Sequence, residues 1–157
     1  MKQSPQLSKA EDAMKPGVIT KEGFLGSDHR HLVDVLIEDD AEVARLGLTH
    51  EIIAEKMKLF KEEGLKGEGL TIDVGENFEV NVESVRGKLA CPFGEPGLIS
   101  KNNVGVINKK TKKKIYFTDF HIHMIEKHGF YQGIGSPYRV SPKELMETLE
   151  IESIYQK

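Results

Sequence analysis

Several segments of the chain carry the same end signals, and these signals constrain the fold more than any other feature. Thr49, Thr118 and Ser141 each precede a stretch with helical spacing of apolar residues, and their side-chain oxygens can cap free backbone amides. Each cap follows an apolar residue that is spaced as a hydrophobic staple with a residue five positions further on. We therefore predict helices over 50–64 and 119–128, and a third that begins after Ser141.

An earlier helix is predicted over 28–46. Ser27 can cap its first turn, and Gly47 can take the left-handed conformation that ends many helices. Leu48 follows Val43 by five residues, which is the spacing of the apolar contact in a Schellman ending. Both ends of this segment therefore carry helix signals.

The polar segment over residues 1–22 is interrupted by Pro5 and by Pro16. Because such a segment buries little apolar surface, we expect a flexible N-terminal arm with one helical turn. The remaining residues, 23–157, are enough to bury a hydrophobic core of their own. We expect them to form a single domain.

Between the second and third predicted helices that follow the arm, the apolar period changes from helical to alternating. Residues 69–90 read as two strands joined at Gly75, with Val80 and Val82 on one face. Residues 103–118 read as a hairpin with a lysine-rich tip. The order predicts an α+β fold, in which an antiparallel sheet of about four strands carries two N-terminal and two C-terminal helices.

The bulk properties exclude several classes of protein. A net charge of −3 gives no general attraction to nucleic acid or to anionic membranes. No apolar run approaches the roughly 18 residues of a transmembrane helix, and the first residues lack the apolar segment of a signal peptide. A single cysteine, Cys91, allows no internal disulfide. We therefore expect a cytoplasmic protein with no membrane partner.

Two charged runs bear on the choice of partner. Residues 109–114 hold five lysines without interleaved arginine or aromatic residues, which favours a solvated hairpin tip over a nucleic-acid contact. The predicted helix over 28–46 is acidic by contrast. Oppositely charged patches of this kind more often face solvent. The alternative is that they pair between copies of the chain in a homo-oligomer.

Half of the six histidines lie in residues 118–133, TDFHIHMIEKHGFYQG. Steps of about 100° per residue place His121 and His128 on the apolar face of the predicted helix and His123 among charged residues. We expect His123 to be solvated, and the other two to be either buried imidazoles with hydrogen-bond partners or parts of a site. Since His121 and His128 lie about 10.5 Å apart along the helix axis, a metal site needs one of them plus groups from elsewhere.

The lone cysteine opens a stiff loop over residues 91–98, CPFGEPGL. Cys91 is expected to be an inert apolar residue at a strand end, and two alternatives remain open. As a thiolate it can hold zinc with His121 or His128, and with Glu95 as a further ligand. As a nucleophile activated by one of these histidines it can carry acyl or thiol chemistry.

The segment over residues 128–139 joins the last two predicted helices and contains three glycines. Its exposed backbone amides, with Tyr131, Tyr138 and Arg139, can hold a carboxylate or a phosphate. The alternative is an ordered connector whose aromatic rings pack on the core.

Two hypotheses for function follow. The first is a non-catalytic cytosolic binding module for a small molecule or a protein partner, with the ligand and the cofactor left open. The second is a small zinc-dependent or Cys-His enzyme, whose catalytic or metal-ligating residues are Cys91, His121 and His128 and whose substrate is held by Tyr131 or Arg139. The first is favoured because each suspect residue has a structural role at least as common in proteins.

Overall fold

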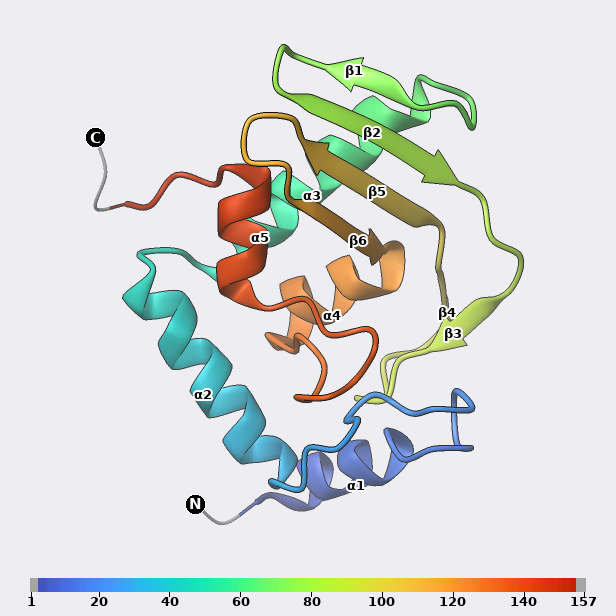
Figure 1. Ribbon diagram of the computed structural model, residues 1–157. Coiled ribbons are helices and arrows are strands. Elements are labelled where there is room, and N and C mark those ends of the chain that lie inside the picture. The colour runs from blue at the N-terminus through green and yellow to red at the C-terminus, as the bar shows by residue number, and fades with distance from the viewer. Residues whose placement is uncertain (1–2, 155–157) are drawn as a thin grey trace.

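A four-stranded antiparallel sheet with the order β1-β2-β5-β6 lies at one end of the molecule (Figure 1). The computed structural model of the chain describes residues 3–154. The sheet consists of two hairpins, formed by β1 (Ile72–Val74) with β2 (Phe78–Glu83) and by β5 (Asn103–Asn108) with β6 (Lys114–Thr118). The predicted strand pairs around Gly75 and across the lysine-rich tip are thereby confirmed.

One face of this sheet carries the main core. The register places Val80 opposite Val106 and Val106 opposite Ile115, so side chains of three strands meet on the same face. Two helices, α3 (His50–Leu65) and α5 (Pro142–Leu149), pack on it. The alternation in the strands thus sets one buried and one solvent-facing side, as expected for a sheet covered by helices on a single face.

A second core cluster lies at the other end of the molecule. It is formed by α1 (Pro5–Ala13), α2 (Leu32–Arg45) and a separate two-stranded sheet of β3 (Lys88–Ala90) and β4 (Leu98–Ser100). The chain is therefore a single α+β domain with a four-stranded sheet, a small second sheet and five helices among its described residues. No described helix combines the length and the apolar character that a membrane crossing requires.

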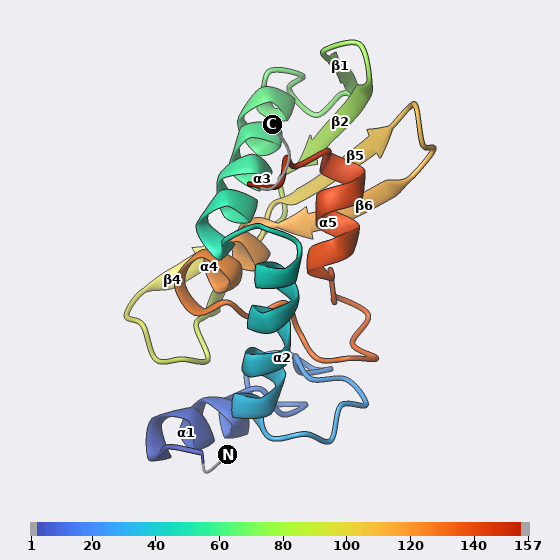
Figure 2. The same ribbon diagram turned by 90° about the vertical axis from the view of Figure 1, so that its left-hand side faces the viewer.

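Helix α4 (Asp119–His128) is shared by the two clusters, and both views place it between the sheet and α1 (Figures 1 and 2). Ile122 and Ile125 belong to the main core, whereas Phe120 and Met124 belong to the second cluster. The apolar arc of this helix is thus divided between two packed surfaces.

The predicted ends of α4 are confirmed. The Thr118 side chain accepts a hydrogen bond from the His121 amide, and Gly129 adopts the left-handed conformation at φ 62°. Gly129 N–H donates to the Ile125 carbonyl at 3.0 Å, which is the bond of an αL ending, and Phe130 N–H donates to the Met124 carbonyl at 3.1 Å instead of the Ile125 carbonyl of a Schellman ending. The local signals alone define this helix.

The N-terminal half departs from the sequence prediction at two places. Within the segment expected to be a flexible arm with one helical turn, Pro5–Ala13 form the longer helix α1, and Ala10 and the capping residue Met14 are buried in the second cluster. The helix expected over 28–46 begins at Leu32, because the Asp28 carboxylate is held by Arg30 and by the Ile134 amide. Its predicted Schellman ending is present, with Leu48 N–H donating to the Val43 carbonyl at 3.0 Å.

The expectation that α3 ends at Gly64 also needs correction, since the helix continues to Leu65. Gly64 does not adopt a positive φ. A Cβ at this position would lie 2.6 Å from Val80 Cγ1 and 2.7 Å from Val82 Cγ2. The glycine allows α3 to approach the sheet closely.

Candidate metal centre

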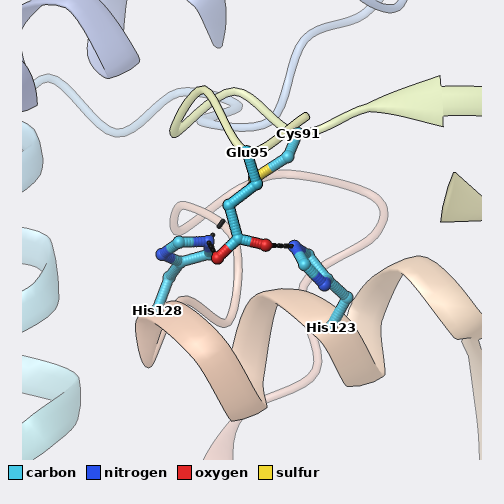
Figure 3. A group of neighbouring side chains, drawn as sticks. All are labelled: Cys91, Glu95, His123 and His128. Atoms are coloured by element: carbon cyan, nitrogen blue, oxygen red, sulfur yellow. Dashed lines mark hydrogen bonds and ion pairs between the residues drawn. The ribbon is translucent and has the colours of Figure 1, made fainter. Parts of the chain in front are cut away.

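Four side chains with metal-ligating atoms converge where the loop between β3 and β4 crosses α4 (Figure 3). Cys91 and Glu95 come from the loop, and His123 and His128 come from the helix. One ligand atom from each residue lies within 4.8 Å of the ligand atoms of the other three. The group therefore contains one sulfur, two imidazole nitrogens and one carboxylate oxygen around a common centre.

Glu95 joins the two histidines. Its Oε2 atom lies 3.1 Å from His123 Nε2, and its Oε1 atom lies 3.3 Å from His128 Nε2. Cys91 Sγ lies 3.4 Å from the same His128 nitrogen. Both imidazoles thus direct their Nε2 atoms toward the carboxylate, and the thiol approaches from the β3 side.

The loop backbone places Cys91 and Glu95 by a tight turn. The Gly94 amide donates to the Cys91 carbonyl at 3.0 Å, and Gly94 and Gly97 both have φ near +90°, at 88° and 89°. Such values are readily adopted by glycine alone, so the two glycines allow the loop to fold back over α4.

Cys91 is buried, and burial raises the pKa of its thiol. The nearby Glu95 carboxylate also raises this pKa, whereas backbone amides of Phe93, Gly94 and Glu95 point at the sulfur and lower it. Without a cation the thiol form is therefore favoured. A bound divalent cation adds the positive charge that a thiolate needs here, and the amides support the thiolate further.

His128 is held in a defined orientation by the loop. The Phe93 ring stacks on it, with the ring centroids 4.2 Å apart and the planes 12° apart. Burial lowers the pKa of His128, and the neighbouring His123 and Lys127 lower it further against the opposing effect of Glu95. The imidazole is therefore neutral at pH 7, which is the form that ligates a metal.

His123 has a free nitrogen at this centre. Its Nε2 atom is buried and has no partner with hydrogen-bond geometry, although Glu95 lies within ion-pair distance. A buried polar atom without a hydrogen bond is costly, at about 1–3 kcal/mol. A metal ion placed between the four residues removes that cost.

The donor set and its dimensions fit zinc. In a tetrahedral site with bonds of about 2.0–2.3 Å, ligand atoms lie roughly 3.3–3.8 Å apart. The closest separations here, from 3.1 to 3.4 Å, are near this range, and the largest is 4.8 Å. The side chains therefore need to move by only about 1 Å to surround one ion.

The structure brings together only part of the trio expected from the sequence. Cys91 and His128 meet, but His121 is used elsewhere: its Nδ1 atom accepts the Thr118 amide at 3.1 Å and its Nε2 atom donates to the Tyr138 carbonyl at 2.7 Å. With both nitrogens engaged, His121 completes the capping box of α4. It has no free atom for a metal in this arrangement.

The expectation that His123 is solvated is wrong, because its side chain is only 18% exposed and faces Glu95. Angular spacing placed it on the polar side of α4, and the loop over residues 91–98 covers that side. The sequence contained one usable signal, which was the acidic Glu95 close to Cys91 in a stiff loop. Helical metal pairs normally use three- or four-residue spacing, so the five-residue spacing of His123 and His128 carries no metal-site signal in the sequence.

The three residues expected to hold a ligand are engaged within the fold. Arg139 donates to both carboxylate oxygens of buried Asp39, at 2.8 and 3.0 Å. The Tyr131 hydroxyl lies 2.8 Å from His50 Nδ1, and burial raises the pKa of this tyrosine far above its ordinary range. Tyr138 lies half exposed, and its carbonyl accepts the hydrogen bond from His121.

Comparison with known proteins adds no family to this description. No family model matches the chain, and neither the curated proteins nor the solved structures give a significant match. The geometry of the site is therefore the basis for any inference about function.

Proposed function

We propose that this protein is a zinc-binding domain that holds one Zn²⁺ ion through Cys91, Glu95, His123 and His128. The convergence of a sulfur, two imidazole nitrogens and a carboxylate within 4.8 Å carries the proposal. The loop between β3 and β4 and the helix α4 each contribute two ligands. Zinc bound here ties the small sheet to the helix shared by both core clusters.

The donor atoms favour zinc over the other common cations. Calcium and magnesium take oxygen ligands, and this group offers a single carboxylate beside one sulfur and two nitrogens. Zinc is borderline in softness and binds sulfur, nitrogen and oxygen together in tetrahedral sites. Cu(I) prefers softer sets that are richer in thiolate or thioether. Zinc is thus the ion to which the set corresponds best.

Four protein ligands correspond to a structural centre rather than a catalytic one. Catalytic zinc sites normally keep three protein ligands and an open position for water. Here Glu95 occupies the fourth position in the group, which supports a non-catalytic binding domain. The metal would then contribute to folding free energy directly.

A metal-free Cys-His nucleophile is less well supported. Such a site needs a thiolate beside an imidazolium or an accepting imidazole. Burial raises the pKa of Cys91 and lowers the pKa of His128, so both shifts favour the neutral pair. Glu95 adds a negative charge that raises the thiol pKa further. The pair therefore supports metal ligation better than nucleophilic attack.

Metal content of purified protein tests the proposal. We expect about one zinc ion per chain by inductively coupled plasma mass spectrometry, and X-ray absorption with a mixed sulfur and nitrogen or oxygen shell. Cys91→Ser and His123→Gln should each lose most of the zinc, whereas His31→Gln, at an exposed histidine, should retain it. Wild-type protein that stays free of zinc after incubation with equimolar Zn²⁺ would overturn the proposal, as would an unchanged zinc content in both ligand variants.

A further inference from the structure

One cavity of the molecule is lined by none of the four candidate metal ligands. The cavity has a volume of about 220 Å³ and is bounded by the second core cluster, the edge of the main sheet and the connector before α5. It collects side chains from segments that are distant in sequence, including Phe24, Leu89, Lys101, Phe120, Gln132 and Tyr138. A partly open concave space with a mainly apolar surface and a small number of polar groups is a usual form of a small-molecule site.

The walls are largely apolar and aromatic. The rings of Phe24 and Phe120 stack with their centroids 5.3 Å apart, and Leu89 packs against the same cluster. Phe120 is held by α4 and Phe24 by the segment before α2, so the wall is formed by packed elements. These rings are only 3% exposed and form the base of the wall, so a flat apolar ligand packs mainly against the more exposed Leu89 and Tyr138.

Gln132 supplies a polar group that lacks a partner. The residue is 2% exposed, and its Oε1 atom is buried without a hydrogen bond. Its backbone has φ 74°, which is uncommon for a residue other than glycine. An unsatisfied buried amide oxygen costs about 1–3 kcal/mol. A ligand that donates a hydrogen bond to this oxygen removes that cost.

Lys101 gives the cavity its charge. It is the one charged side chain among the residues that line the cavity, and no carboxylate within residues 3–154 forms an ion pair with it. Burial raises the pKa of the Tyr138 phenol and the nearby Glu22 raises it further, but Glu22 does not line the cavity. A single unpaired cation beside apolar walls favours an anionic ligand.

We propose that this cavity binds a small aromatic carboxylic acid with a ring-borne hydrogen-bond donor. The ring packs against Leu89 and Tyr138 above the buried rings of Phe24 and Phe120, the carboxylate pairs with Lys101, and the donor reaches the amide oxygen of Gln132 after that side chain rotates toward the cavity. The size agrees with this class, since a cavity of about 150 Å³ already holds benzene. The additional volume accommodates a carboxylate and a hydroxyl.

Binding of 4-hydroxybenzoate by the complete, zinc-incubated chain tests the proposal. Isothermal titration and amide chemical shifts should show saturable binding, with shifts at Lys101, Phe120 and Gln132. Two comparison ligands separate the contributions: the uncharged 4-hydroxybenzamide lacks the carboxylate, and benzoate lacks the donor. Each should bind about tenfold more weakly, which corresponds to the loss of one charge-assisted or one buried hydrogen bond.

Substitutions of residues that line the cavity test the binding of 4-hydroxybenzoate independently. Lys101→Gln should weaken 4-hydroxybenzoate about tenfold, and Leu89→Trp should abolish binding by filling the cavity. Lys88→Gln, at an exposed lysine in β3 outside the cavity, is the matched control and should leave binding unchanged. If Lys101→Gln fails to fold, the comparison of acid and amide on wild-type protein decides the same question.

Two results would overturn the proposal. One is the absence of saturable binding at millimolar 4-hydroxybenzoate. The other is equal affinity for the acid and the amide together with indifference to Lys101→Gln, since the ligand would then not be recognised as an anion.

Discussion

Cys91 and His128 are 37 positions apart in the chain, yet the thiol sulfur of one lies 3.4 Å from Nε2 of the other. Cys91 directly follows the first strand of the small sheet, and His128 is the last residue of α4. A ligand that bonds both atoms therefore connects a surface hairpin to the helix between the two cores. The stability of the loop over residues 91–98 should depend on that ligand.

Removal of zinc is accordingly expected to destabilise the protein. If free zinc exceeds its dissociation constant about a thousandfold, the free energy of unfolding falls by about 4 kcal/mol on chelation. Urea unfolding with excess Zn²⁺ and with EDTA measures this difference, and hydrogen exchange should accelerate first in residues 91–98. His123→Gln should already be as unstable as the chelated protein, and EDTA should change its stability little. An EDTA effect of equal size in wild type and His123→Gln would contradict the prediction.

Acid should destabilise the zinc-free protein through His121. Burial lowers the pKa of this histidine below its ordinary value of 6.5. The unfolded chain therefore binds more protons than the folded one between the two pKa values. The contribution of His121 is complete above pH 6.5 and is lost as the pH falls below that value toward the folded-state pKa.

His121→Gln provides the comparison for this pH effect. Glutamine does not titrate and suits the same capping-box position, so the variant should lose part of the pH dependence while it keeps α4. Free energies of unfolding from urea titrations between pH 8 and 5 measure the slope. His128 has a pKa lowered in the same direction and accounts for part of the remaining slope. An unchanged slope in His121→Gln would show that His121 does not titrate as inferred.

The local parts of this fold were predictable from the sequence, and the contacts that form the site were not. Thr118 and Gly129 define α4 through hydrogen bonds within a few residues, so their signals could be read directly. His123 was misplaced because the position of the covering loop depends on packing between distant segments. A helical projection assigns polar residues to solvent, and here that polar side faces Glu95.

The cavity was even less predictable from the sequence than the position of His123. Gln132 gave no sequence signal, because its positive φ and its unpaired amide arise only when the connector packs against the segment that contains Phe24. The sequence predicts that Arg139 helps to hold a carboxylate or a phosphate of a ligand. The sequence did not reveal that the carboxylate belongs to Asp39 of the same chain, 100 residues earlier.

Removal of either partner of the buried pair of Arg139 and Asp39 should destabilise the folded state strongly. Arg139→Met leaves the Asp39 carboxylate buried without its partner, which should cost about 3–5 kcal/mol in free energy of unfolding. Arg139→Lys keeps the positive charge but cannot donate to both carboxylate oxygens with the planar geometry of arginine. Its free energy of unfolding should lie between those of wild type and Arg139→Met. Arg45, which pairs with Glu42 at the surface, gives the control: Arg45→Met should cost less than about 1 kcal/mol. Equal losses in the two methionine variants would contradict the assignment.

Gly64 should be intolerant of alanine even though it lies within a helix. Alanine favours the helix by about 1 kcal/mol, but its Cβ would lie 2.6 Å from Val80 Cγ1 and 2.7 Å from Val82 Cγ2 in the sheet. Overpacking of this kind costs about 1–3 kcal/mol, so Gly64→Ala should have a lower free energy of unfolding than wild type in urea titrations. Truncation of the opposing residue tests the cause, because Val82→Ala should destabilise the Gly64→Ala protein less than it destabilises wild type. If the losses in free energy of unfolding from Gly64→Ala and Val82→Ala were additive, the contact between α3 and β2 would not be the cause of the effect at Gly64.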